Sequence, residues 1–194
     1  MDKFEQIIDR VREFTTEAHG TQTRRYSRDP YIVHPMRVMT TCRNYSTDLS
    51  MLCAAILHDV LEDTPVTKSD LENFLRRLMP GPQAEKTLQL VVDLTDVYTR
   101  ASFPALNRRA RREKEAERLS HTHPDAQTVK YADILDNTDV AANDPDFART
   151  FLRECMVILD KMKDGHPQLR QRAITRVKEC LDHLGSRESA SPIR

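Results

Sequence analysis

Hydrophobic residues recur along most of the 194-residue chain at intervals of three and four, which is the spacing of one face of an α-helix. Few glycines and few long runs of β-branched residues also favour helices. We therefore predict an all-α protein, a bundle of about eight helices. They cover residues 3–18, 48–62, 83–97 and 168–184, and others begin at Pro35, after Thr67 or Ser69, at Pro124 and at Pro145.

Two segments between these helices are predicted to be irregular. Pro30 and Pro35 bracket a short extended piece, residues 31–34. Residues 98–120 carry seven basic side chains and only a weak apolar stripe. The simplest interpretation of this basic segment is a solvated face or a mobile loop. The alternative interpretation is a basic flap over an anionic ligand.

Length and charge limit the classes of protein to consider. We expect a single domain over residues 1–185, because no repeat divides the chain, and a disordered tail over residues 186–194. The 30 basic and 30 acidic residues balance, which argues against a nucleic-acid or membrane-surface partner. No apolar run approaches the roughly 18 residues of a membrane span. Because the first residues lack the apolar core of a signal peptide, we expect a cytoplasmic location.

Glycine is scarce, with four residues, and no two are close enough to form a GxGxxG or GxxxxGK loop. Phosphate-binding loops of the Rossmann and P-loop kinds are therefore excluded. Any phosphate chemistry in this chain would use side chains or a metal ion.

The predicted helix over residues 48–62 ends in an unusual group of polar side chains. His58 and Asp59 lie near the end of an apolar run, and Glu62 and Asp63 follow one turn later. A buried imidazole or carboxylate is costly unless it is paired or binds a metal. On a helix His58 and Glu62 share one face. One helix end therefore presents an imidazole and three carboxylates.

A second polar group lies on the sixth predicted helix. Asp133 and Asn137 are four residues apart among mostly apolar neighbours, and Lys130 precedes Asp133 on the same side. Asp136 and Asp139 fall on other faces of this helix. We expect these two aspartates to be exposed to solvent.

Four segments carry these groups in a fixed order: AHGTQTRR (18–25), DPYIVHP (29–35), AAILHDVLEDT (54–64) and TVKYADILDNT (128–138). Their order and spacing resemble the HD superfamily of metal-dependent phosphohydrolases. Within that superfamily they are similar to the hydrolase domain of the RelA/SpoT-type alarmone enzymes and to the small alarmone hydrolases. The resemblance implies the helical HD-domain fold.

The resemblance also implies roles for individual side chains. Two imidazoles and two carboxylates would bind one divalent metal ion, which is usually Mn²⁺ in this branch. Two acids outside the metal shell would activate water and assist the leaving group, and which of them activates water is left open. Basic and amide side chains would contact the nucleotide. The implied metal ligands are His34, His58, Asp59 and Asp133, the catalytic acids are Glu62 and Asp63, and the substrate-binding residues are Arg24, Arg25, Asn137 and Lys130.

The activity implied by the resemblance is Mn²⁺-dependent hydrolysis of guanosine 3′,5′-bis(diphosphate), which releases the 3′-pyrophosphate and leaves GDP or GTP. Two alternatives stay open. The same centre could act on another nucleotide, such as an adenosine alarmone or NADPH, or the chain could be a nucleotide-binding HD protein without catalytic activity. Because all four implied ligands and both acids are present, the enzyme is favoured.

Overall fold

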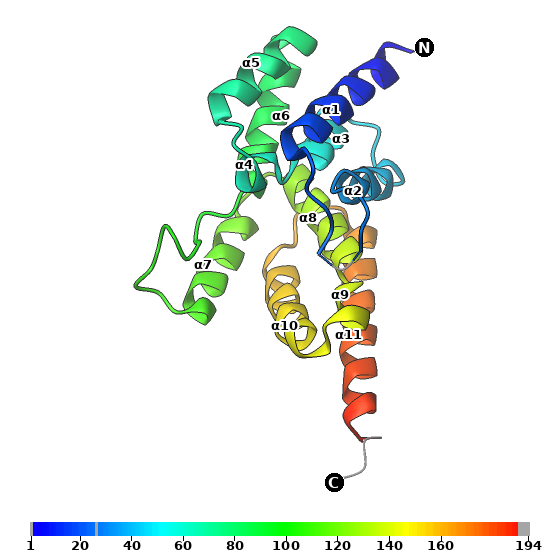
Figure 1. The fold of residues 1–194 in the computed structure, drawn as a ribbon, viewed down its shortest axis with the longest axis vertical. Coiled ribbons are helices and arrows are strands. Elements are labelled where there is room, and N and C mark those ends of the chain that lie inside the picture. Colours follow the sequence, from blue (N-terminus) through cyan, green and yellow to red (C-terminus); the bar gives the residue numbers. More distant parts are fainter. Residues whose placement is uncertain (1, 26, 190–194) are drawn as a thin grey trace.

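The structure, a computed structural model, describes residues 2–25 and 27–189, and Figure 1 shows that this part of the chain is built from helices. It contains no strand in these residues, where Thr23 and Pro30 form an isolated β-bridge. The predicted all-α fold is confirmed. The helices are α1 (Lys3–His19), α2 (Val33–Arg43), α3 (Leu49–Leu57), α4 (Val60–Asp63), α5 (Lys68–Leu78), α6 (Gly81–Leu94), α7 (Arg108–Ser120), α8 (Pro124–Asn137), α9 (Val140–Asn143), α10 (Pro145–Lys161) and α11 (Pro167–Ser189).

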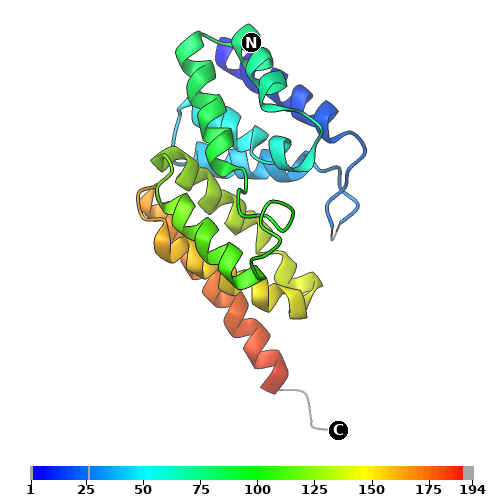
Figure 2. The same ribbon diagram turned by 90° about the vertical axis from the view of Figure 1, so that its left-hand side faces the viewer.

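Helices α3 and α8 form the centre of the molecule, as Figures 1 and 2 show from two sides. Helix α3 packs against α1, α2 and α6, and α8 packs against α2, α3, α6 and α11. Residues 50–57 of α3 are all buried, because this helix is apolar on every side. Helix α11 is long, and its C-terminal end extends beyond the other helices (Figure 1). The polar side chains carried by α3 and α8 therefore lie deep within the bundle.

Polar side chains at helix N-termini set where these helices begin. Asp48 accepts a hydrogen bond from the backbone N–H of Met51 (2.8 Å) at the start of α3. Thr67 and Asp70 form a capping box at the start of α5, so Thr67 and not Ser69 is the cap. Such bonds satisfy backbone donors that have no partner within the helix.

The helix predicted over residues 48–62 is interrupted near its end. Helix α3 ends at Leu57 and α4 begins at Val60, which leaves His58 and Asp59 between them. Asp59 has φ −97° and ψ −6°, close to the bridge region of backbone space. In a regular helix the side chains of adjacent residues point about 100° apart. The interruption lets the two neighbouring side chains converge.

The prediction of an extended segment over residues 31–34 is wrong. Tyr31 lies in a turn that leads directly into α2, and His34 is already part of the first turn of that helix. The backbone N–H of His34 donates to the carbonyl of Tyr31 (3.0 Å) and closes the turn. Pro35 is accommodated because N–H groups in the first helical turn have no intrahelical acceptor.

The basic segment, residues 98–120, is an irregular stretch followed by α7. Helix α7 packs against α10, and its Glu115 is buried. The Glu115 carboxylate accepts hydrogen bonds from the backbone N–H groups of Val97 and Tyr98 (3.1 and 2.9 Å). The prediction of a mobile loop is therefore wrong for residues 108–120, which form α7. The apolar pattern missed the helix because a glutamate occupies one of the buried positions.

Two other helix ends differ from the prediction. Helix α6 covers residues 81–94 in place of 83–97. Helix α11 runs to Ser189, beyond the predicted end at residue 184 and into the expected tail. Residues 190–194 of that tail lie outside the described residues. Among the helices that the structure describes, none is long and apolar enough to cross a membrane.

Gly165, between α10 and α11, gives a test of the packing. A Cβ atom at this position would lie 2.5 Å from Cε2 of Tyr131 and 2.8 Å from the backbone nitrogen of Thr128. We expect Gly165→Ala to lower the free energy of unfolding by about 1–3 kcal/mol, because ring and backbone must move. Gly185→Ala in α11, where a Cβ meets nothing within 4 Å, should raise the free energy of unfolding by up to about 1 kcal/mol, because alanine favours the helix. Denaturant unfolding measures both, and equal effects would contradict the packing described.

Candidate metal centre

Four side chains converge where α2 and α8 meet the break between α3 and α4. Nε2 of His34 lies 3.2 Å from Oδ1 of Asp133, and Nε2 of His58 lies 3.0 Å from Oδ2 of Asp59. The distances from His34 to Asp59 and from His58 to Asp133 are both 3.7 Å. Asp59 is 20% exposed, and the other three side chains are buried. The structure thus brings together the four side chains that the sequence suggests as metal ligands.

Each imidazole is held through Nδ1, which directs Nε2 at the carboxylates. Nδ1 of His58 donates to the carbonyl of Ala55 (2.9 Å), and Nδ1 of His34 lies 2.7 Å from Oδ2 of Asp136. Nε2 of His58 is buried and, although the carboxylates of Asp59 and Asp133 lie close to it, it makes no well-aligned hydrogen bond among the described residues. A metal ion satisfies such a nitrogen, and the hydrogen bond at Nδ1 orients the ring for it. The set of two nitrogens and two oxygens suits a divalent metal ion.

The charges in this group also favour a cation. Burial disfavours the protonated ring of His58, but the carboxylates of Asp59 and Asp133 outweigh it and raise the pKa of His58 to about 10. Burial opposes ionisation of Asp133, yet the ammonium group of Lys130 and the imidazoles of His34 and His58 hold the pKa of Asp133 well below its usual range. The imidazoles of His58 and His34 likewise lower the pKa of Asp59, so both carboxylates stay ionised at neutral pH. A metal ion bound here would displace protons from the imidazoles.

Polar side chains around the two aspartates fix the positions of their oxygens. The hydroxyl of Tyr31 donates to Oδ2 of Asp59 (2.6 Å). The ammonium group of Lys130 donates to Oδ2 of Asp133 (2.8 Å), and the amide of Asn137 donates to its Oδ1 (2.6 Å). Partners of this kind orient metal ligands and tune their basicity.

The two acids proposed as catalytic occupy different environments. Glu62 faces the cavity beside the four ligands, and its carboxylate accepts a hydrogen bond from the backbone N–H of Asp96 (3.3 Å). Burial and the nearby carboxylate of Asp96 raise the pKa of Glu62 to about 7. Asp63 does not line this cavity and instead accepts a hydrogen bond from the hydroxyl of Tyr31 (3.2 Å). Glu62 is thus the better placed of the two acids to exchange a proton with a ligand.

Two adjoining cavities give access to the centre. The inner cavity, of about 210 Å³, is lined by His34, Asp59, Asp133 and Glu62 among others. The outer cavity, of about 510 Å³, shares part of its wall with the inner one and is rich in cationic and aromatic side chains. These side chains are Arg24, Arg25, Arg37, Arg108, Arg112, Phe147 and Phe151.

The four residues that the sequence suggests for substrate binding all face these cavities. Arg24 and Asn137 line both, Arg25 lines the outer cavity and Lys130 the inner one. The guanidinium group of Arg24 donates to Oδ1 of Asn137 (3.2 Å), so these two side chains form one polar wall. The guanidinium group of Arg25 lies 5.1 Å from the ring centre of Phe147.

Asp136 was expected to be exposed, and this expectation is wrong. Its side chain is 13% exposed, holds Nδ1 of His34 and lies 3.6 Å from the guanidinium group of Arg24. The signal in the sequence was the interval of three residues from Asp133, which places both carboxylates toward the same side of α8.

Five other side chains at the cavities were not predicted from the sequence, for a different reason. Asp96, Arg37, Arg112, Phe147 and Phe151 come from four separate elements and carry no local motif. Among the described residues, the basic run of α7 gave the one hint, because the alternative interpretation of that run was a basic flap over an anion.

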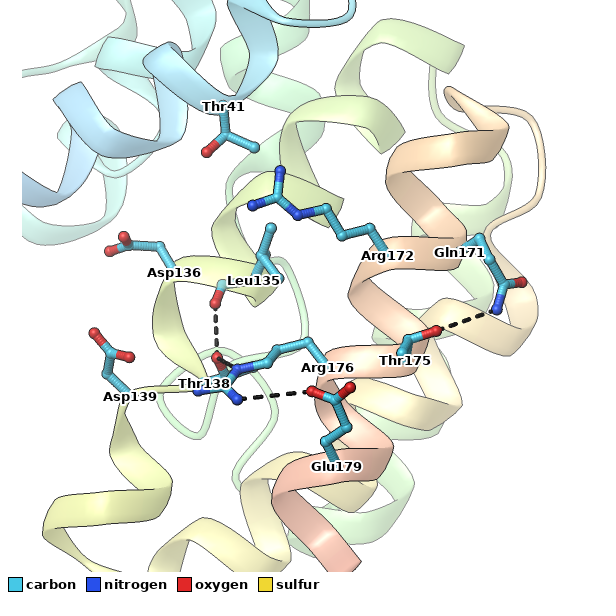
Figure 3. A pocket seen from close by; sticks show the side chains of 10 residues that line it. All are labelled: Thr41, Leu135, Asp136, Thr138, Asp139, Gln171, Arg172, Thr175, Arg176 and Glu179. Atoms are coloured by element: carbon cyan, nitrogen blue, oxygen red, sulfur yellow. Dashed lines mark hydrogen bonds and ion pairs between the residues drawn. The ribbon is translucent and has the colours of Figure 1, made fainter.

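A third cavity, of about 520 Å³, lies on the other side of α8 (Figure 3). It is bounded by α2, α8 and α11, and it meets the candidate metal centre at Asp136. Its charged lining is mixed, since Arg172, Arg176 and Glu179 come from α11, and Asp136 and Asp139 lie across the cavity from them. This cavity therefore lacks the concentration of positive charge that distinguishes the outer cavity.

Comparisons with known proteins agree with this geometry. The family model described as "HD domain" matches residues 12–158. A solved structure, described as a metazoan ortholog of SpoT that hydrolyzes ppGpp and plays a role in starvation responses, superposes with a TM-score of 0.72. The match covers 95% of this chain and 97% of that one, at 23% sequence identity. This likeness shows the shared fold.

Curated relatives include alarmone hydrolases of bacteria and mammals. The probable guanosine-3′,5′-bis(diphosphate) 3′-pyrophosphohydrolase of Mycoplasma pneumoniae is 29% identical over 140 residues, which are 68% of this chain and 18% of the relative. The mouse guanosine-3′,5′-bis(diphosphate) 3′-pyrophosphohydrolase MESH1 is 34% identical over 128 residues, 64% of each chain. The bifunctional (p)ppGpp synthase/hydrolase SpoT of Escherichia coli is 44% identical over 73 residues, 36% of this chain and 10% of the relative. This chain therefore spans only a small part of the bacterial relatives.

The raised pKa of His58 leads to a prediction about metal binding. Near pH 7 this imidazole holds a proton that a metal ion must displace, so binding should release about one proton or more per metal ion. Calorimetric titration with Mn²⁺ in two buffers of different ionisation enthalpy measures the release. Affinity should also weaken as the pH falls, because protons compete for the same nitrogen. A binding enthalpy that is the same in both buffers would contradict this account of the centre.

Proposed function

Because the chain belongs to the HD domain family, we propose that it is a Mn²⁺-dependent hydrolase that removes pyrophosphate from the 3′ position of guanosine tetra- or pentaphosphate and leaves GDP or GTP. The observation that carries this proposal is the convergence of His34, His58, Asp59 and Asp133 beside an arginine-lined cavity. The names of the relatives from Mycoplasma pneumoniae and mouse support the same activity.

The four ligands would hold the metal ion at the inner end of the two cavities. A bound divalent ion would lower the pKa of a coordinated water and offset negative charge on the phosphate. Hard oxygen donors combined with imidazole nitrogens are compatible with Mn²⁺. Tyr31, Lys130 and Asn137 would keep the two aspartates in place through the hydrogen bonds described above.

The arginines and Lys130 would bind and orient the phosphates of the substrate. Arg24 lines both cavities, so its guanidinium group could contact a phosphate oxygen near the metal centre and another farther out. Guanidinium groups bind phosphate through pairs of parallel hydrogen bonds, which fixes orientation as well as position. Lys130 would add a point charge beside the reacting phosphate.

Glu62 is the side chain that we assign to proton transfer. With its pKa raised to about 7 it can both accept and return a proton at neutral pH. Glu62 takes a proton from the attacking water, whose oxygen bonds to the phosphorus attached to the 3′ oxygen. The bond between that phosphorus and the 3′ oxygen breaks, and the 3′ oxygen receives the proton from Glu62. One water is consumed, and a free 3′-hydroxyl and pyrophosphate result.

Incubation of the purified protein with guanosine tetraphosphate, followed by separation of the nucleotides, tests the proposed function. We expect GDP and pyrophosphate in Mn²⁺ and no turnover in EDTA. Parallel reactions with an adenosine alarmone and with NADPH identify the nucleotide. Turnover of one of these with guanosine tetraphosphate untouched would contradict the proposed substrate. If the nucleotides bind but none is turned over, the proposal that this protein is an enzyme would be contradicted, and a non-catalytic nucleotide-binding protein would be favoured.

Two isosteric variants separate the roles of the neighbouring acids. Glu62→Gln removes the group that exchanges protons, so we expect kcat to fall by about 10²–10⁴-fold with a smaller change in KM. Asp63→Asn is the matched control, because Asp63 lies beside Glu62 in the sequence but outside the inner cavity. Steady-state kinetics on the two proteins gives both constants. A larger loss of kcat for Asp63→Asn would reverse the assignment.

A further inference from the structure

Two arginines of α7 occupy one face of that helix beside the candidate metal centre. Arg108 and Arg112 are one turn apart. Arg108 lines the outer cavity, and Arg112 lines both cavities. Both arginines belong to the basic segment, so part of the positive charge of that segment lies at the two cavities.

Both arginines are turned toward a single carboxylate of α10. Nε and an amino group of Arg108 donate to the two oxygens of Glu154, at 2.6 and 2.8 Å. Nε of Arg112 lies 3.6 Å from the same carboxylate, while another of its nitrogens donates to Asp96 (2.9 Å). The Glu154 side chain is 17% exposed and lines the inner cavity. Glu154 therefore stands where the inner and outer cavities adjoin.

A third guanidinium group reaches the same place from the loop after α1. The guanidinium groups of Arg25 and Arg108 lie 5.1 and 5.6 Å from the ring centre of Phe147. A guanidinium group stacked on a ring still donates hydrogen bonds from its edges, and that of Arg25 lies 3.7 Å from the carboxylate of Asp144. Phe147 thus holds two cations of the outer cavity close together.

We propose that Arg25, Arg108 and Arg112 form a second phosphate subsite, for the phosphate group of the nucleotide that is remote from the metal centre, and that Glu154 occupies it when no ligand is bound. This proposal rests on the proposed function in one respect: the nucleotide carries phosphate at two positions. The subsite distinguishes such ligands from those phosphorylated only at the reacting position.

The chemistry of the two anions explains the exchange. A phosphate group carries a charge of about −1.5 to −2 and three acceptor oxygens, more than the carboxylate of Glu154 offers. It can take over the paired hydrogen bonds from Arg108 and reach Arg112 and Arg25 as well. A ligand without this second phosphate leaves Glu154 on Arg108 and gains nothing from the subsite.

Calorimetric titration of the metal-loaded protein with GDP, with guanosine as reference, tests the subsite without any need for turnover. Glu154→Gln removes the competing charge, so GDP should bind about tenfold more tightly. Arg108→Gln should weaken GDP binding about tenfold. Guanosine affinity should stay unchanged in both variants.

Each variant has a matched control on the same helices. Glu117→Gln breaks a different ion pair between α7 and α10, from Lys161 to Glu117, which lies on the exposed side. Arg109→Gln removes the neighbouring arginine, which is 87% exposed and pairs with Glu113 of its own helix. Both controls should bind GDP as the unmodified protein does, and urea unfolding checks that all four variants fold.

The outcomes separate this subsite from the proposed function. Weaker GDP binding by Glu154→Gln would overturn the proposal, because the carboxylate would then position the arginines and not compete with the ligand. Unchanged GDP binding in both Glu154→Gln and Arg108→Gln would overturn it as well. Tighter binding by Glu154→Gln in a protein that fails to hydrolyse guanosine tetraphosphate would support the subsite and contradict the proposed function.

Discussion

Two imidazoles and two carboxylates share a volume from which most water is excluded, so the carboxylates must be balanced there by Lys130 together with imidazole protons or a bound cation. Desolvation of each charged group costs free energy, and mutual pairing offsets only part of that cost. Nε2 of His58 is the least satisfied atom of the group, because it is buried 3.0 Å from Asp59 and yet makes no well-aligned hydrogen bond within the described residues. A divalent ion at this point would take the place of the imidazole protons and give this nitrogen a partner.

Helix α8 shows how one element can serve the centre with several side chains. Asp133 faces the imidazoles, Lys130 and Asn137 hold its two oxygens from one turn before and after, and Asp136 holds Nδ1 of His34. Intervals of three and four residues bring these side chains toward one side of the helix. The packing of α8 against α2 and α3 then carries them to the two histidines. The centre is therefore as rigid as the helix packing around it.

The sequence predicted the parts of this arrangement that depend on local spacing. Helical periodicity gave the all-α fold, and an imidazole with three carboxylates at the end of an apolar run marked the position of His58. The features that the sequence could not predict depend on tertiary packing. The break at His58 and Asp59 lies where α2 and α8 approach α3, and Arg37, Arg112 and Phe151 meet only when distant helices pack. Asp136 was misjudged because His34, its partner, lies far away in the sequence.

The most direct test of the central claim is the metal content of the protein. After expression in Mn²⁺-supplemented medium and gel filtration, elemental analysis should find one divalent metal ion per chain. Asp133→Asn should lose it, whereas Asp139→Asn, which changes an exposed aspartate of the same region, should retain it. Unmodified protein without stoichiometric metal, or full retention by Asp133→Asn, would contradict the account of the centre given above.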